Sequence, residues 1–174
     1  MTNQQSCHKF ILGLTDDETA VLDLDEFKFK TAKYWAIRTM KWFKLGGYLI
    51  LRSSQNNYHV VFDRKVSWAE NMKIVAWVCL LSHKPKLVKW FLMQCIKGAS
   101  TLRVGNKQEK SSPRIVCRYG SQEMQIKDFL AHRKVIRSIN RKVSIFMQKK
   151  DAEKSLLVEV EREEDYPLRI VHIQ

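Results

Sequence analysis

The order of apolar and polar residues along the chain predicts an alternation of short strands and helices. Strands are expected where apolar residues form short runs or alternate with polar ones, at 9–14, 20–25, 48–52, 58–63, 100–104, 114–119, 142–148 and 156–160. Helices are expected where apolar residues recur every three or four positions, at 32–44, 68–81, 85–96 and 123–139. The pattern therefore predicts both kinds of element along most of the chain.

Capping and turn residues predict where these elements begin and end. Thr31 and Ser67 are expected as helix N-caps, and Pro85 suits the first turn of a helix. Gly98 is expected to end the helix that begins at Pro85. The polar residues 53–57 predict a five-residue hairpin loop. In the last helix, four residues are expected to point inward: Ile126, Phe129, Leu130 and Val135.

The order of elements predicts an α+β fold, a mixed and partly antiparallel sheet covered by helices. The length of 174 residues fits one domain, 1–174. Its core is expected at about 10–119, followed over 120–174 by a basic helix and C-terminal strands. No internal repeat or low-complexity segment interrupts this order.

The charge distribution points to a polyanionic partner. The net charge is +13, and the acid-free runs 71–108 and 129–150 contain seven Lys or Arg each. A strongly basic surface attracts nucleic acid or nucleotide phosphates. The cations expected to contact nucleic acid are Lys84, Lys86, Lys89, Arg133, Lys134, Arg137 and Arg141.

Cysteine spacing and hydropathy indicate the cellular environment. The four cysteines have no metal-ligand spacing, and Cys79 and Cys95 lie in apolar helical runs, which is typical of buried free thiols in a reducing compartment. No apolar run reaches the roughly 18 residues that span a membrane, and 1–9 is polar rather than signal-like. We therefore expect a soluble, cytoplasmic protein without a membrane partner.

Two acids on one strand are the first candidate site. Asp23 and Asp25 alternate with Leu22 and Leu24, so their side chains share one face of the strand, about 7 Å apart. Two carboxylates beside apolar residues favour a bound cation, and Mg²⁺ is held by one or two carboxylates together with phosphates. A strand end that points its acids into solvent is the alternative.

Polar residues on the following strands form a second group. His59 follows a polar turn, and Arg103 and Lys107 flank a Gly-Asn turn after another strand. Such donors suit phosphate and sugar oxygens; a structural histidine and a charged turn are the alternatives. The expected nucleotide-binding residues are Ser53, Ser54, Asn57, His59, Arg103 and Lys107.

This series of motifs resembles the catalytic core of the archaeo-eukaryotic primase superfamily, the primase-polymerases of archaea, plasmids and viruses. The resemblance covers about 10–119 and implies an RRM-like core that carries out nucleotidyl transfer on a DNA template. It implies that Asp23 and Asp25 bind Mg²⁺ or Mn²⁺ and that, with His59, they are catalytic. It also implies nucleoside triphosphate substrates, a nucleoid-associated location in a prokaryotic host, and a helicase or other replication protein as a partner.

The third acidic motif of that family has no counterpart between residues 71 and 108. The third ligand could come from Asp63, Glu70 or Glu109, or the enzyme could work with two acids. Alternatively, the domain has lost catalysis and acts as a nucleic-acid-binding module. Two other classes stay open: a two-histidine replication nuclease, for which only one histidine stands on the strand, and a structural or interaction protein.

Overall fold

The computed structural model describes residues 12–106 and 111–149, with side chains up to residue 138, and has an α+β fold. The strands are β1 (Gly13–Asp16), β2 (Thr19–Asp25), β3 (Gly47–Ser54), β4 (Asn57–Lys65), β5 (Ser100–Arg103) and β6 (Arg114–Gly120). The helices are α1 (Phe29–Phe43), α2 (Trp68–Ser82), α3 (Pro85–Lys97) and α4 (Gln125–Lys149). The predicted fold class is confirmed at this level.

The main sheet has four strands in the order β2-β4-β3-β6, and each strand is antiparallel to its neighbours. Strands β2 and β3 therefore run in the same direction on either side of β4, and α1 connects them. A second, two-stranded sheet pairs β1 with β5, also antiparallel. In the described part of the chain every strand pairing is antiparallel, so the sheet is more regular than the sequence predicts.

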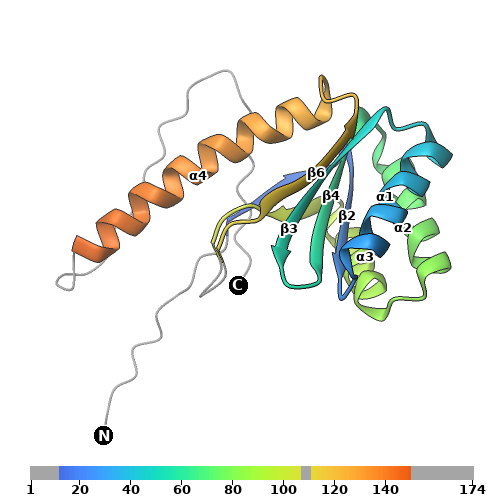
Figure 1. The fold of residues 1–174 in the computed structure, drawn as a ribbon, viewed down its shortest axis with the longest axis horizontal. Helices are drawn as coiled ribbons and strands as arrows, with labels where there is room; N and C mark the ends of the chain where they lie inside the picture. The colour runs from blue at the N-terminus through green and yellow to red at the C-terminus, as the bar shows by residue number, and fades with distance from the viewer. Residues whose placement is uncertain (1–11, 107–110, 150–174) are drawn as a thin grey trace, which may run out of the picture.

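Helices α1, α2 and α3 lie on one side of the main sheet and α4 on the other (Figure 1). Strand alternation sends the two sets of side chains to these two sides. Toward α1–α3 the sheet buries Leu22, Leu24, Ile50, Val60 and Phe62, among others. Toward α4 it buries Val21, Leu49, Leu51 and Val61, which pack with Leu102 of β5 and with Ile126 and Phe129 of α4.

Helix α4 is longer than the sequence pattern predicts. It continues to Lys149, so the strand expected at 142–148 is wrong. The alternation in those seven residues is too short to oppose helix propagation, because no glycine or proline interrupts 125–149. The phase of α4 also differs: Ile136 is buried, whereas Val135, expected inward, is 46% exposed. The other predicted C-terminal strand, 156–160, lies outside the described residues.

Several predicted ends are confirmed and others are shifted. The Ser67 hydroxyl accepts a hydrogen bond from the Glu70 amide, Pro85 occupies the first turn of α3, and Gly98 caps that helix with φ of 70°. Thr31 is not an N-cap, because α1 begins two residues earlier at Phe29. The expected first strand, 9–14, is observed as β1 at Gly13–Asp16, and 9–11 lie outside the described residues.

The β3–β4 hairpin is tighter than the predicted five-residue loop. Ser54 pairs with Asn57, so only Gln55 and Asn56 form the turn. Asn56 adopts a left-handed φ of 57°, a conformation that asparagine tolerates better than most residues. The register shift between Arg52 and Ser54 brings Ser54, rather than Ser53, opposite Asn57. Because the turn has only two residues, β3 and β4 stay paired up to Ser54 and Asn57.

Asp63 anchors α4 over the sheet. It lies on β4, is 2% exposed, and its carboxylate accepts hydrogen bonds from the Ser121 hydroxyl and from the amides of Glu123, Met124 and Ile126. A carboxylate at a helix N-terminus satisfies unpaired amides and interacts favourably with the helix dipole. This contact fixes where α4 starts and so determines which part of the sheet α4 covers.

Within the described residues, no helix combines the length and apolar character needed to cross a membrane.

Candidate functional site

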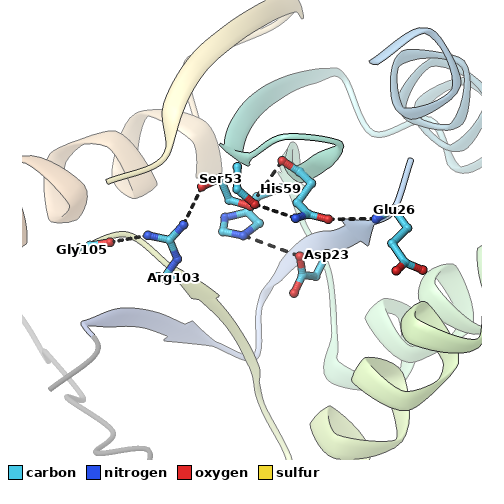
Figure 2. A network of polar contacts seen from close by, with 8 residues as sticks. Asp23, Glu26, Ser53, His59, Arg103 and Gly105 are labelled. Atoms are coloured by element: carbon cyan, nitrogen blue, oxygen red, sulfur yellow. Dashed lines mark hydrogen bonds and ion pairs between the residues drawn. The ribbon is translucent and has the colours of Figure 1, made fainter. Parts of the chain in front are cut away.

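Asp23 and His59 face each other across β2 and β4, on the side of the sheet that faces α4. They are direct partners in the antiparallel register, and His59 Nε2 lies 3.6 Å from Asp23 Oδ1. The His59 side chain is 5% exposed and that of Asp23 is 21% exposed. Two of the three predicted catalytic residues therefore lie together, with the histidine buried and the acid partly exposed (Figure 2).

Asp25 and Asn57 form the next pair along the same two strands. The side-chain amide nitrogen of Asn57 donates a hydrogen bond of 2.6 Å to the Ser54 hydroxyl, and its side-chain oxygen accepts one of 2.9 Å from the Glu26 main-chain amide. One side chain thus connects the end of β2 with the β3–β4 hairpin (Figure 2). Sequence reasoning assigned Asn57 to nucleotide binding only, whereas in the structure it also braces the carboxylate-bearing strand.

Arg103 reaches the same end of the sheet from β5. Its guanidinium donates to the carbonyl oxygens of Ser53 and Gly105, both at 2.8 Å (Figure 2). It also donates to the Ser111 carbonyl at 3.1 Å. An arginine has five N–H donors, so two remain beyond these three bonds. Burial lowers the pKa of Arg103, and the carboxylates of Asp23 and Asp25 act in the opposite direction. Arg103 is therefore close enough to both acids to offset part of their charge.

His59 is neutral at physiological pH. Its pKa is lowered to about 3, mainly by burial and also by the Arg103 guanidinium, while a main-chain hydrogen bond with Arg103 acts in the opposite direction. The Asp23 carboxylate, at 3.6 Å, also favours the protonated ring, but the direction of the shift is downward because the ring is shielded from water. A neutral imidazole has one donor and one acceptor nitrogen.

This shift predicts that the protein loses stability on acidification. The unfolded histidine binds a proton near pH 6.5, whereas the folded one does so only near 3, so its contribution is complete above 6.5 and falls as pH drops toward 3. At about pH 5 the loss should be about 2 kcal/mol relative to neutral pH. Urea unfolding of wild type and His59→Gln at the two pH values measures it. Equal pH dependence in the two proteins would contradict the assignment.

The predicted basic residues of α3 lie beside the end of β2. Lys86 Nζ is 2.7 Å from a Glu26 carboxylate oxygen, and Lys84 Nζ lies 5.5 Å from the centre of the Phe27 ring. The charges of both lysines lower the pKa of Glu26, with the Lys86 contact as the larger cause. Lys89 is exposed. A cationic surface therefore borders the carboxylates.

The predicted cations of α4 have different environments. Arg133 is 8% exposed and donates to the Pro113 carbonyl, so its assignment to nucleic acid is corrected to a structural role. Lys134 is exposed and Arg137 is half-buried. Arg141 lies within α4, but its side chain is not among those described, and Lys107 lies outside the described residues.

The three candidate third acids do not join Asp23 and Asp25. Asp63 caps α4, as described above, and Glu70 pairs with Arg64. Glu109 lies outside the described residues. Over 12–106 and 111–149, no group of three or more His, Cys, Asp or Glu is arranged to hold a metal ion. The donors available for a divalent cation are two carboxylates on one face, which fit Mg²⁺ or Mn²⁺ when substrate phosphates and water complete the coordination.

The cysteines include one clear departure from prediction. Cys79 is a buried free thiol, as expected, and burial raises its pKa to about 11. Cys95 is also free, but it is exposed, because it lies on a side of α3 that faces away from the sheet.

Comparison of the chain with protein-family models, with curated proteins and with solved structures finds no match. Functional inference for this chain therefore rests on the arrangement of its own side chains.

Proposed function

We propose that this domain is a minimal primase-polymerase, which transfers nucleotides to a nucleic acid strand on a DNA template. One observation carries the proposal. Asp23, Asp25, His59 and Arg103 come from three separate strands and meet at one end of the face toward α4. Acids beside phosphate-binding donors are what metal-dependent phosphoryl chemistry requires.

The residues divide this work by chemistry. Asp23 and Asp25 would hold Mg²⁺ or Mn²⁺, which when bound activates the attacking hydroxyl and offsets charge on the leaving pyrophosphate. The two spare donors of Arg103 are suited to triphosphate oxygens. Neutral His59 is buried against Asp23, adds no positive charge there, and so leaves that carboxylate its full charge for the metal. The Ser54 hydroxyl accepts from Asn57 and keeps its own proton to donate.

The topology supports an RRM-like core for this activity. Strands β2 and β3 are parallel, are joined by α1, and leave room between them for β4, which is the split β-α-β arrangement. The fourth strand, β6, lies beside β3 rather than beside β2. The proposal is therefore strongest for the β2-α1-β3-β4 part, which also carries both acids and His59.

The cations around the site supply a path for the template. Lys86 is exposed on α3 and contacts Glu26 at the end of β2, and Lys89 of α3 and Lys134 of α4 are also exposed. Their charges would contact the template backbone irrespective of sequence. A helicase or other replication protein is the partner that a minimal domain of this kind would need.

A direct assay tests the proposal. The protein is incubated with a DNA template, dNTPs or NTPs, and Mg²⁺ or Mn²⁺, with and without a primer. We expect metal-dependent synthesis or extension that EDTA abolishes. Absence of any product with every combination of nucleotide and metal would sink the proposal.

A catalytically reduced, nucleic-acid-binding domain is the second candidate. It is favoured by Asp63 and Glu70, which are engaged away from the site, and by Arg103, which spends three donors on main-chain carbonyls. Binding without catalysis needs the cations but not the carboxylates.

Salt dependence provides a prediction for nucleic-acid binding. If about four phosphates are contacted, the slope of log affinity against log salt for a single strand should be about −3. The affinity should then fall about 50-fold between roughly 50 and 200 mM salt. Fluorescence anisotropy with a labelled oligonucleotide measures the slope. If Asp23→Asn abolishes synthesis and leaves this slope unchanged, the protein is an enzyme; if neither protein makes product, the binding module is favoured. An affinity that does not change with salt concentration would contradict both the polymerase and the binding module.

A further inference from the structure

An aromatic cluster lies on the outer surface of α1 and α2, on the side of the sheet away from Asp23. Trp42 of α1 stacks on Trp77 of α2, with ring centres 5.8 Å apart and an interplanar angle of 18°. Trp42 is nevertheless 68% exposed, and Tyr34, two turns earlier on α1, is 51% exposed. A single exposed apolar side chain needs no explanation, but a group of exposed aromatic rings on one surface marks an interaction site.

Arg38 holds the cluster together and adds charge to it. Its guanidinium carbon lies 5.9 Å from the centre of the Tyr34 ring, 5.5 Å from that of Trp35 and 5.3 Å from that of Trp77. It also donates a hydrogen bond of 2.9 Å to the Tyr34 hydroxyl. The rings are therefore held in place before any ligand arrives, which reduces the entropy that binding must overcome.

The charge of this helical layer selects an anionic partner. Helices α1, α2 and α3 contain four, one and three Lys or Arg respectively, against one acid, Glu70, which pairs with Arg64. Lys41 lies on the same side of α1 as Tyr34 and Arg38, by helical spacing, and Lys73 lies one turn before Trp77 on α2. Both lysines are exposed. Cations thus flank the exposed rings on both helices.

We propose that this surface binds single-stranded nucleic acid, with bases stacked on Trp42 and Tyr34 and phosphates on Lys41 and Lys73. Flat aromatic faces between cations are how proteins hold single strands without reading their sequence. An acidic peptide or an anionic membrane would also satisfy the charge, and the experiments below distinguish them from a nucleic acid strand. The surface is separated from Asp23 by the sheet, so it is a second strand-binding site, independent of the proposed catalysis (Figure 1).

Anisotropy titrations with a labelled 15-nucleotide oligo(dT) test the proposal. Stacking contributes about 1–3 kcal/mol per base, so Trp42→Ala should weaken binding about tenfold, whereas Trp42→Phe should stay within about threefold of wild type. Lys41→Gln should weaken binding less and make the salt slope shallower. Tyr119→Ala is the matched control, because Tyr119 is 57% exposed and stacks on Tyr48 at the far edge of the sheet. Its affinity should not change.

A crosslinking experiment locates the contact. Oligo(dT) carrying 5-iodouracil, irradiated with the wild-type protein, should form adducts on the peptides that contain Tyr34 or Trp42. Unchanged affinity in both Trp42→Ala and Tyr34→Ala would overturn the proposal. So would Trp42→Ala and Tyr34→Ala variants that lose binding to a poly-glutamate peptide or to phosphatidylserine vesicles but bind the oligonucleotide like wild type. Asp23→Asn should bind oligo(dT) like wild type even if no nucleotide is ever incorporated, which separates this inference from the proposed catalysis.

Discussion

Replacing Asp23 by asparagine is expected to lower template-dependent nucleotide incorporation by at least about 100-fold, with little change in oligonucleotide affinity. The carboxylate is 21% exposed, lies on the same face as Asp25, and is the acid closest to His59. An amide keeps the size of the side chain but removes the charge that a divalent cation requires. Initial rates of incorporation at saturating Mn²⁺, compared with wild type, measure the effect.

Asp17→Asn is the matched control for this experiment. Asp17 is an exposed acid between β1 and β2, outside the cluster formed by Asp23, His59 and Arg103. Its loss changes the net charge by the same amount without touching the proposed site. If Asp17→Asn and Asp23→Asn retain equal activity, the carboxylate pair has no catalytic role, and the assignment of the site fails even if the protein makes product.

Replacing Asp63 by asparagine is expected to reduce the free energy of unfolding by about 3 kcal/mol or more. The buried carboxylate accepts four hydrogen bonds, three of them from main-chain amides at the start of α4. An asparagine presents an NH₂ group to some of those donors and loses the charge that the helix dipole favours. Thermal unfolding should show a drop of about 10 °C.

The Asp63 variant also distinguishes two roles for Asp63, as a helix cap or as the third metal ligand. A capping residue predicts lost stability with normal activity per folded molecule at low temperature. A metal ligand predicts normal stability and an apparent metal affinity that is weakened in incorporation assays. Glu123→Gln is a suitable control, because it removes an acid from the same segment. Glu123 contacts Asp63 through its main-chain amide and not through its carboxylate.

Much of the framework follows from local sequence. Strand β2 is predicted within one residue because its alternation is unambiguous, and that alternation alone places Asp23 and Asp25 on a common face. Ser67, Pro85 and Gly98 mark helix ends because each satisfies or tolerates a local backbone requirement that the chain carries with it. Such features depend only on neighbours a few positions away.

The tertiary structure decided what those elements bring together. The β2–β4 register places His59 opposite Asp23, and the β1–β5 ribbon delivers Arg103, which is 80 positions from Asp23 in the sequence numbering. The same long-range packing makes Asp63 a helix cap and buries Arg133. From the sequence alone, Asp63 is a candidate metal ligand and Arg133 a candidate nucleic-acid contact. Periodicity encodes which face a side chain takes, because it repeats within one element. Partners across strands depend on register and on which layer covers the sheet, and those are set only when the whole domain packs.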